Sequence, residues 1–455
     1  MKTKFTKTIL VLAALLASSA QAADWQDLFN GKDLSGWKQL GGEARYVVEG
    51  DQIVGYTVAD TPNSFLTTEK DYGDFILEYE LYVDPSMNSG VQIRSHTNDK
   101  DVVYGYQVEV DPSPRRFSGG FYDEQRRGWL YPLSLNEKGR DAFRNGTWNH
   151  YRIEAIGNSF QVFVNGIQTA AVIDDMDTEG FIGLQVHSIR DEAMEGRTVR
   201  WRQLRILTDD LEANRTPRDP EVQELSFLEN QLSDTEVRQG WRLLWDGETS
   251  DGWRGAKLDQ FPDWGWTIED GVLTVAETEG KESAGPGDIV TLGSFSNFEF
   301  RFEFKITEGA NSGIKYFVDP ELNKGEGSAI GCEFQILDDQ VHPDAKKGVN
   351  GNRTLASLYD LVTAENLNTE GRAKQFRGIG QWNRGRIVSD NGKVEHWLNG
   401  EKYVEFDRHS QMFRALVAYS KYKVWPGFCQ WPEGQLLLQD HGNEVSYRNL
   451  KVREW

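Results

Sequence analysis

Cysteine is almost absent from this sequence, with only Cys332 and Cys429 among 455 residues. A chain of this length buries enough apolar surface to fold without disulfide cross-links, so the disulfide frameworks of small secreted domains are excluded. The two cysteines either pair in an oxidising compartment or remain as two buried thiols. Long apolar runs are also absent after residue 22, which excludes a membrane-spanning helix in the rest of the chain.

Positive charge is scarce as well. The sequence has 50 Lys and Arg against 71 Asp and Glu, a formal net charge of −21. Nucleic acid is therefore excluded as a partner, because a binder must supply Lys and Arg to replace the counterions on phosphates. The motifs GxSxG, HExxH and GxGxxG and the Walker sequence do not occur at convincing places, which removes several common enzyme classes.

The N-terminus has the pattern of a signal peptide. Three lysines precede an apolar run that ends in Ala20-Gln21-Ala22, and this ending suits signal peptidase. We expect cleavage after Ala22, and no cysteine follows that would carry a lipid anchor. The sequence thus predicts a signal peptide over 1–22 and a periplasmic or secreted protein.

An internal repeat organises the remainder of the chain. Seven segments recur in the same order, namely LFNGKDLSGW (28–37) as LWDGETSDGW (244–253), VVEGDQIV (47–54) as TIEDGVLTV (267–275), NSGVQIRS (88–95) as NSGIKYFV (311–318), WNHYRI (148–153) as WNRGRI (382–387), FVNG (163–166) as WLNG (397–400), LQVHS (184–188) as LQDHG (438–442), and VRWRQLRI (199–206) as VSYRNLKV (445–452). We expect domains at 23–208 and 239–455. The charged segment 209–238 reads as a linker with a short helix, since Ser233 and Glu236 form a capping box.

Within each copy the hydrophobic period is two. FILEYELYV (75–83) and FEFRFEFKI (298–306) alternate apolar and polar residues, and 151–166 and 385–400 read as hairpins with Gly-Asn or Asn-Gly turns. Long helical periodicity is nearly absent. Short strands separated by glycine-rich turns predict an all-β protein with two tandem antiparallel β-sandwich or jelly-roll domains.

Polar residues of copy two gather on and after one strand. In GCEFQILDD (331–339), Glu333 and Gln335 share the face opposite Cys332. The loop that follows, 338–348, holds several groups able to act as acid, base or cation, or to bind a divalent metal ion: Asp338, Asp339, His342, Asp344, Lys346 and Lys347. A solvated outer face and an ordinary exposed loop are the alternative interpretation, and the spacing does not define a metal site.

A second polar group follows the strand GQLLL near the C-terminus, where Gln439, Asp440 and His441 stand together. If the hairpin 392–400 lies beside this strand, His396 and His441 converge with Glu333. Copy one departs here. It has Gln107 and Glu109 where copy two has Glu333 and Gln335, and Val186 in place of Asp440.

These segments together resemble the 3-keto-disaccharide hydrolase domain found in bacterial exported proteins. The resemblance rests on LxDGxxxxGW near the start of the copy, Asn311-Ser312-Gly313, the strand from Glu333 to Asp338, Trp382-Asn383, Leu398-Asn399-Gly400 and the closing segment from Leu438 to Val452. Copy two matches closely, whereas copy one is divergent. The resemblance implies a concanavalin A-like (lectin/glucanase) jelly roll that acts on an oxidised di- or oligosaccharide or another glycoside with a ketone at C3.

A C3 ketone acidifies the hydrogen on C2, so a base can form an enolate that expels the C1 aglycone, and water then adds to the alkene. We assign Glu333 or His441 as the base, Lys346 or a bound cation at the C3 oxygen, and His342 as the acid. The residues expected to bind the sugar are Gln335, Asp338, His396, Gln439 and Asp440.

Three alternatives stay open. The first is a carbohydrate-binding sandwich without catalysis, since one fold serves both purposes. The second is a duplicated scaffold or adhesion protein. The third is a glycosidase that uses two carboxylates, although no suitably spaced pair stands out.

Overall fold

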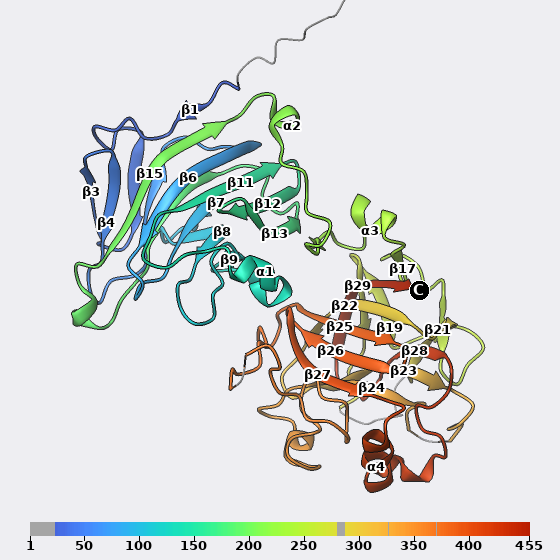
Figure 1. The fold of residues 1–455 in the computed structure, drawn as a ribbon. Coiled ribbons are helices and arrows are strands. Elements are labelled where there is room, and N and C mark those ends of the chain that lie inside the picture. The colour runs from blue at the N-terminus through green and yellow to red at the C-terminus, as the bar shows by residue number, and fades with distance from the viewer. Residues whose placement is uncertain (1–22, 280–286, 326, 370) are drawn as a thin grey trace, which may run out of the picture.

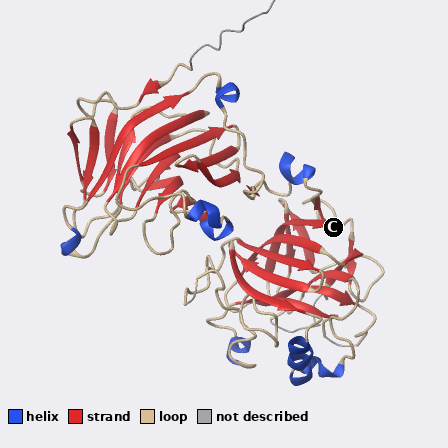
Figure 2. Cartoon of the chain, viewed as in Figure 1, coloured by secondary structure: helices blue, strands red, loops and turns tan. Residues whose placement is uncertain are grey.

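The computed structural model describes residues 23–279, 287–325, 327–369 and 371–455, so the expected signal peptide over 1–22 lies outside the described residues. Figure 1 shows two β-sandwiches side by side, the first coloured blue to green and the second yellow to red. Strands dominate both, and the few helices lie at their margins (Figure 2). No helix in the described ranges is long and apolar enough to cross a membrane.

The first sandwich consists of two sheets. In the described residues the larger sheet runs β16 (Leu225–Ser226), β13 (Ile167–Ile173), β12 (Ser159–Val164), β11 (Asn149–Ile156), β6 (Phe75–Val83), β15 (Thr198–Leu207), β4 (Gln52–Tyr56) and β3 (Arg45–Glu49), with β1 (Gln26–Asp27) paired to β15. The smaller sheet runs β10 (Gly128–Tyr131), β9 (Phe121–Glu124), β8 (Val103–Val110), β7 (Ser89–Thr97), β14 (Phe181–Val186), β5 (Ser64–Thr68) and β2 (Trp37–Gly41).

The second sandwich repeats this plan. Its larger sheet runs β19 (Trp266–Glu269), β20 (Val272–Val275), β29 (Val445–Glu454), β22 (Phe298–Ile306), β25 (Asn383–Asp390), β26 (Lys393–Leu398) and β27 (Glu401–Asp407), with β17 (Arg242–Leu243) paired to β29. Its smaller sheet, as far as the described residues define it, runs β18 (Trp253–Gly255), β21 (Ile289–Phe295), β28 (Gly434–Leu438), β23 (Asn311–Asp319) and β24 (Ile330–Leu337).

Alternation along the strands builds the two cores. Leu77 and Tyr79 of β6 lie in the first core and Phe300 and Phe302 of β22 in the second, as the period of two predicts. Both expected hairpins form, β11 with β12 and β25 with β26. The prediction of two tandem antiparallel β-sandwiches is confirmed.

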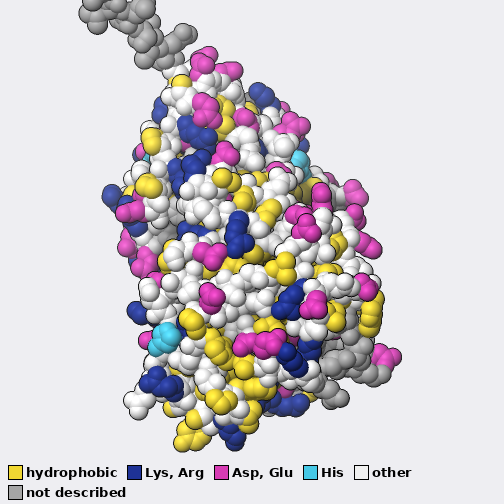
Figure 3. Space-filling model, turned by 90° about the vertical axis from the view of Figure 1, so that its right-hand side faces the viewer, with side chains coloured by type: hydrophobic (Ala, Val, Ile, Leu, Met, Phe, Trp, Pro, Cys, Tyr) yellow, Lys and Arg dark blue, Asp and Glu magenta, His cyan; other side chains and the backbone are white. Residues whose placement is uncertain are grey.

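The polar face of the larger sheet is also ordered. Glu299 on β22 is buried beneath Arg386 and Arg453, at 2.7 Å from each guanidinium group. Burial alone would raise its pKa, but Arg301 and these two arginines lower it to about 2. On the face drawn in Figure 3, acidic side chains are interspersed with Lys and Arg, so the net negative charge is not gathered in one patch there.

The segment 209–238, expected as a linker with a short helix, contains three short elements: α2 (Leu211–Asn214), β16 and α3 (Asp234–Arg238). α3 begins with the capping box of Ser233 and Glu236. β16 pairs in parallel with β13, and Val222, Leu225 and Phe227 join the first core. Part of this segment therefore belongs to the first sandwich, while the expected domain boundaries stay a prediction.

Short helical elements cover the ends of the sandwiches: η1 (Leu133–Leu135), α1 (Glu137–Arg140), η2 (Glu192–Met194), η3 (Pro343–Lys346), α4 (Gln411–Tyr419) and η4 (Lys421–Val424). Of the two alternatives left open for the cysteines, the structure shows the paired one. A disulfide joins Cys332 on β24 to Cys429, five residues after η4 ends.

Candidate active site

A pocket of about 310 Å³ opens on the smaller sheet of the second sandwich. Its floor comes from β23 and β24, on the face opposite the core residues Ile314 and Phe334. η4 and the segment before β24 form its walls. The lining residues are Asn311, Lys315, Asn323, Ser328, Ala329, Ile330, Gly331, Glu333, Tyr359, Lys421, Tyr422, Trp425, Gln439 and His441.

An ion pair lies on the floor of this pocket. β23 and β24 pair with Lys315 directly opposite Glu333, and Lys315 Nζ lies 3.8 Å from Glu333 Oε2. Both side chains are buried. Burial raises the pKa of Glu333, against the opposing effects of Lys315, Lys421 and His441. Glu333 is therefore a stronger base, once ionised, than an exposed glutamate.

A second carboxylate holds the lysine from the other side. Lys315 Nζ donates to Ser328 Oγ and, at 3.1 Å, to the main-chain oxygen of Ala329. Ser328 Oγ donates in turn to Asp288, which also accepts from the amides of Ala329 at 3.2 Å and Asp440 at 3.0 Å. Burial raises the pKa of Asp288, and Lys315 opposes this rise. The ammonium group is thus fixed in place beside Glu333.

Gln439 and His441 enter the pocket where the chain leaves β28. The main-chain oxygen of Gln439 accepts from Ser312 Oγ at 2.7 Å, while its Oε1 is buried and has no hydrogen-bond partner among the described residues. Next to Glu333, Gln335 Nε2 contacts Asn311 Oδ1 at 3.1 Å. With its amide turned over, the same nitrogen donates to Glu333 Oε1 at 3.0 Å. This group offers donors and acceptors suited to hydroxyl groups.

Three of the expected site residues thus line the pocket, namely Glu333, Gln439 and His441, and Gln335 lies beside Glu333 on the same face of β24. His342 lies next to this group, with its ring edge-on to His441 at a centroid distance of 6.3 Å. His342 Nδ1 accepts from the amide of Asp344 at 3.2 Å, so in the neutral ring Nε2 carries the proton. Burial and the neighbouring His441 lower the pKa of His342.

The structure places four other expected residues away from the pocket lining. Lys346 is exposed on η3. Asp338 accepts from the amides of Gly309 and Gln340, and Asp440 accepts from those of Gly287 and Gly442, so both carboxylates hold loops.

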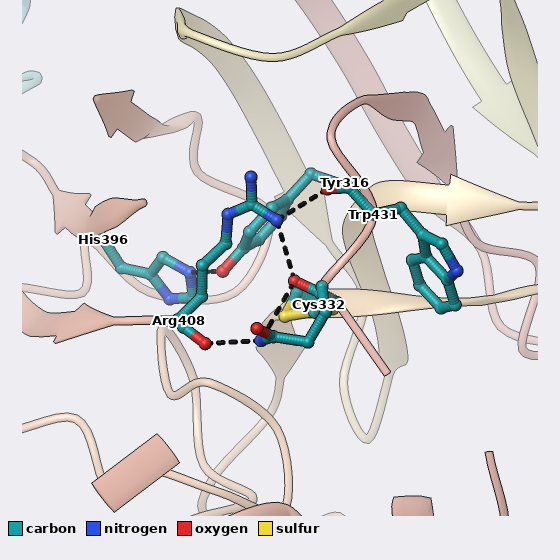
Figure 4. Close-up of a disulfide and its surroundings, with 7 residues drawn as sticks. Tyr316, Cys332, His396, Arg408 and Trp431 are labelled. Atoms are coloured by element: carbon teal, nitrogen blue, oxygen red, sulfur yellow. Dashed lines mark hydrogen bonds between the residues drawn. A yellow bond between two sulfur atoms is a disulfide. The ribbon is translucent and has the colours of Figure 1, made fainter. Parts of the chain in front are cut away.

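The fourth, His396, lies in the core. It belongs to β26 of the larger sheet, not to the sheet that contains β28. Tyr316 Oη bonds to its Nε2 at 2.8 Å and the main-chain oxygen of Ala356 to its Nδ1 at 3.1 Å. Figure 4 shows His396 and Tyr316 facing one another. Burial lowers the pKa of His396 to about 4, so the ring is neutral near pH 7.

Sequence reasoning missed Lys315, Lys421 and Trp425. Lys315 carried a signal, because in NSGIKYFV it alternates with the core residues Ile314 and Tyr316 and so faces outward with Glu333. Lys421 is exposed along part of its length, and its ammonium group lies 4.3 Å from the centre of the Tyr359 ring. Burial and Lys315 lower its pKa, while Glu333 acts in the opposite sense.

No group of three or more His, Cys, Asp or Glu residues in the described ranges is arranged to hold a metal ion.

Comparison with known proteins places the chain in a family. The model of the 3-keto-alpha-glucoside-1,2-lyase-like domain matches residues 24–207 and again residues 240–453. The chain belongs to this family. Its two family domains coincide with the two copies of the repeat.

One curated relative is the 3-keto-disaccharide hydrolase of Bacteroides thetaiotaomicron, which is 35% identical over 234 residues, covering 47% of this chain and 78% of the relative. Among solved structures, a candidate glycosyl hydrolase of Parabacteroides distasonis is 29% identical with a TM-score of 0.43 and covers 50% of this chain and 99% of its own. A carbohydrate-binding module of Bacillus subtilis is 16% identical with a TM-score of 0.27, over 38% of this chain and 95% of its own.

The two family domains differ at the ion pair. In the first, Gln92 and Gln107 stand opposite each other where the second has Lys315 and Glu333, and Gln92 Nε2 donates to Gln107 Oε1 at 2.8 Å. Gln107 Nε2 donates to Glu109, whose pKa burial raises to about 7. The first family domain therefore has the same strand register but no buried ion pair at this position.

The disulfide ties one wall of the pocket to its floor. Cys332 precedes Glu333 on β24 and faces the core, and Cys429 closes the segment that carries Lys421, Tyr422 and Trp425. Arg408 adds to this link, since its guanidinium donates to the main-chain oxygens of Cys429 at 2.9 Å and Trp431 at 2.7 Å (Figure 4). The pocket wall is thus held by one covalent bond and two charge-assisted hydrogen bonds.

Proposed function

We propose that the second family domain cleaves 3-keto-glycosides by eliminating the C1 aglycone and then hydrating the product, a net hydrolysis. The observation that carries this proposal is the buried pair of Lys315 and Glu333 on the floor of the pocket. Such a reaction needs a base for a carbon-bound proton beside a fixed positive charge for the oxygen that becomes negative. Glu333 provides the base and Lys315 the positive charge, on residues that face each other across neighbouring strands.

Glu333 is the base in this proposal. Ionised Glu333 takes the proton from C2, and the electron pair of the C–H bond moves into the C3 carbonyl to give an enolate. The cost of holding a carboxylate in this buried place is relieved when it becomes protonated, which favours the transfer. Gln335, beside it on β24, orients the carboxylate through the bond that its turned-over amide makes.

Lys315 and Lys421 stabilise the enolate oxygen. Both ammonium groups lie near Glu333, one on the floor and one at the wall of the pocket. They take the place first assigned to Lys346, whose side chain is exposed outside the pocket. Positive charge held in a desolvated place, as on Lys315, stabilises a developing oxyanion without reorganisation during the reaction.

His441 supplies the proton for the leaving group, with His342 beside it. As the enolate collapses, the C1–O bond breaks, C1 and C2 become doubly bonded, and the aglycone oxygen takes a proton. Water then adds its hydroxyl to C1 and its hydrogen to C2, which releases the free 3-keto sugar. Polar side chains of the pocket lining, such as Tyr359 and Asn323, bond to the sugar hydroxyls.

The first family domain favours a second candidate function, carbohydrate binding without catalysis. Its uncharged pair of Gln92 and Gln107 supplies neither base nor cation. Gln185, at the place of Gln439, is buried with both amide atoms unpartnered among the described residues. The first family domain thus repeats Gln439 without the ion pair. We also propose that the whole chain is exported, because residues 1–22 have the pattern of a signal peptide.

Turnover of a panel of 3-keto-glycosides and of their unoxidised parents tests the catalytic proposal. We expect aglycone release from the keto compounds alone, and uptake of solvent deuterium at C2 when the reaction runs in D₂O. Glu333→Gln should lower kcat/KM by about 10²–10⁴-fold. Glu269→Gln, on the exposed edge of β19, is the matched control and should change nothing.

Addition and removal of Mg²⁺ and Mn²⁺ in the same assay would show whether a cation assists the lysines. Full turnover in both Glu333→Gln and His441→Ala would disprove the assigned site.

A further inference from the structure

A second cavity, of about 960 Å³, lies between the two sandwiches. It is about three times as large as the pocket over Glu333 and shares no lining residue with it. Its first wall comes from the β9–β10 hairpin and the segment after β13. Its second wall comes from β22, β29 and the residues before β25.

Direct contacts between the sandwiches hold these walls together. Arg377 of the second sandwich donates to the main-chain oxygen of Trp129 at 2.7 Å. Arg384 donates to that of Ser226 on β16 at 2.6 Å. From the first sandwich, Ser134 donates to the main-chain oxygen of Gly400 at 3.0 Å. The cavity is therefore bounded by an ordered interface.

The first wall presents donors and acceptors in fixed positions. Arg127 bridges Asp123 at 2.5 Å and Asp174 at 2.6 Å, and Arg126 bridges Asp123 and Asp177. These ion pairs hold the wall in shape. Beside them, the exposed side chains of Gln125 and Asp175 can hydrogen-bond to a ligand in the cavity.

The second wall combines an aromatic ring with further polar groups. The guanidinium of Arg448 lies 4.3 Å from the centre of the Trp382 ring and donates to Glu303 at 2.7 Å. Tyr122 and Phe227 add aromatic surface on the first wall. Aromatic rings beside hydrogen-bonding groups suit ligands that have both C–H and hydroxyl surfaces.

The charges that line the cavity nearly cancel. Four arginines, Arg126, Arg127, Arg377 and Arg448, face five carboxylates, Asp123, Asp174, Asp175, Glu229 and Glu303. A strongly anionic or cationic ligand would meet repulsion from one of these sets. Asp123, Asp174 and Glu303 are buried and paired with arginines, so the exposed lining groups decide what binds. A neutral ligand rich in hydroxyl groups can donate to Asp175 and Glu229 and can bond to the amides of Gln125 and Gln381.

We propose that the cavity between the sandwiches is a second binding site, which takes a neutral oligosaccharide and does not cleave it. Its size suits a longer chain than the pocket over Glu333 can hold. Because both sandwiches contribute walls, the bound chain holds them together. This site goes beyond the proposed catalytic function and stands whether or not Glu333 is a base.

Equilibrium binding by calorimetry tests this site in the full chain carrying Glu333→Gln. The probes are unoxidised gluco-, galacto- and manno-oligosaccharides of four to six units. We expect one of these series to bind and to raise the midpoint of thermal unfolding. Trp382→Ala should weaken binding more than about tenfold, as for aromatic anchors in other binding sites. Gln381→Ala, an exposed lining residue whose loss breaks no ion pair, should weaken it as well.

Two matched controls lie outside the cavity. Trp264→Ala removes a tryptophan that is 58% exposed elsewhere on the second sandwich, and Trp425→Ala alters the pocket over Glu333. Both should leave oligosaccharide binding unchanged. The proposal is overturned if no neutral series binds, if only anionic oligosaccharides bind, or if the controls weaken binding while the cavity variants do not. Turnover of 3-keto-glycosides by the cavity variants of the otherwise unaltered chain reports separately on the catalytic proposal.

Discussion

Replacing Lys315 and Glu333 together by glutamine gives the second sandwich the uncharged pair that the first already contains. Gln92 and Gln107 occupy the same register with a hydrogen bond of 2.8 Å, so two glutamines fit this pair of strands. The double variant should therefore fold. It leaves Asp288 without Lys315, so it should be less stable than the unaltered chain but more stable than Lys315→Gln. It should have no measurable turnover, because the base and the buried cation beside it are both lost while Lys421 alone remains.

The single variants should behave differently. Lys315→Gln leaves Glu333 buried without its nearest cation, and breaking a buried pair in this way costs about 3–5 kcal/mol. This cost should fall as the pH is lowered, since Glu333 then takes up a proton. Glu333→Gln is milder, because Lys315 keeps its link to Asp288 through Ser328. The double-mutant cycle should give a coupling energy of about 2 kcal/mol.

Urea unfolding of the full chain gives the global values. Hydrogen exchange of peptides from β23 and β24 assigns the change to this sheet. The reasoning about the pair is refuted if the double variant is as unstable as Lys315→Gln. It is equally refuted if Lys315→Gln costs nothing at pH 8, since the pair would then not be desolvated.

Three further predictions concern the same sandwich. Burial raises the pKa of Glu333, so kcat/KM should begin to fall with decreasing pH at a pH above about 4.3, the usual pKa of a glutamate. A pH profile that is unchanged in Glu333→Asp would argue against Glu333 as the base. His396 has a pKa of about 4 when folded and about 6.5 when unfolded, so stability should be lost as the pH falls from about 6.5 to about 4, and urea midpoints should show a flatter dependence in His396→Gln. The disulfide spans 97 positions, so Cys332→Ser with Cys429→Ser should cost about 4–5 kcal/mol in denaturant unfolding, whereas a loss below about 1 kcal/mol would contradict a structural role.

Most of the fold could be predicted because its signals are local. The repeat divides the chain into copies, and the period of two in segments such as 75–83 and 298–306 states which side chains face the core. β16 was not foreseen, since two residues in parallel pairing carry no periodicity of their own. β16 lies where it does because β13 would otherwise be an edge strand with unpaired main-chain groups.

Site residues could be predicted only where they lie on the same strand or directly after the end of a strand. Glu333 and Gln335 follow from alternation, and Gln439 and His441 from the abrupt polar end of GQLLL. Lys421 and Trp425 come from a segment about ninety residues after Glu333, brought in by the disulfide, and no sequence spacing records that approach. His396 was expected in the site because its hairpin was assumed to lie beside β28. The sandwich instead puts these strands in opposite sheets, where Val394, His396 and Leu398 alternate into the core.

The parallel pairing of β16 with β13 also determines how the chain can be divided. A chain cut at 208 would uncover Val172 and Ile173, the residues of β13 that pair with β16, and would remove Val222, Leu225 and Phe227 from the core. Unpaired edges of this kind recruit other strands and aggregate. The connecting segment therefore protects the first sandwich. The first domain thus depends on residues that follow its copy of the repeat.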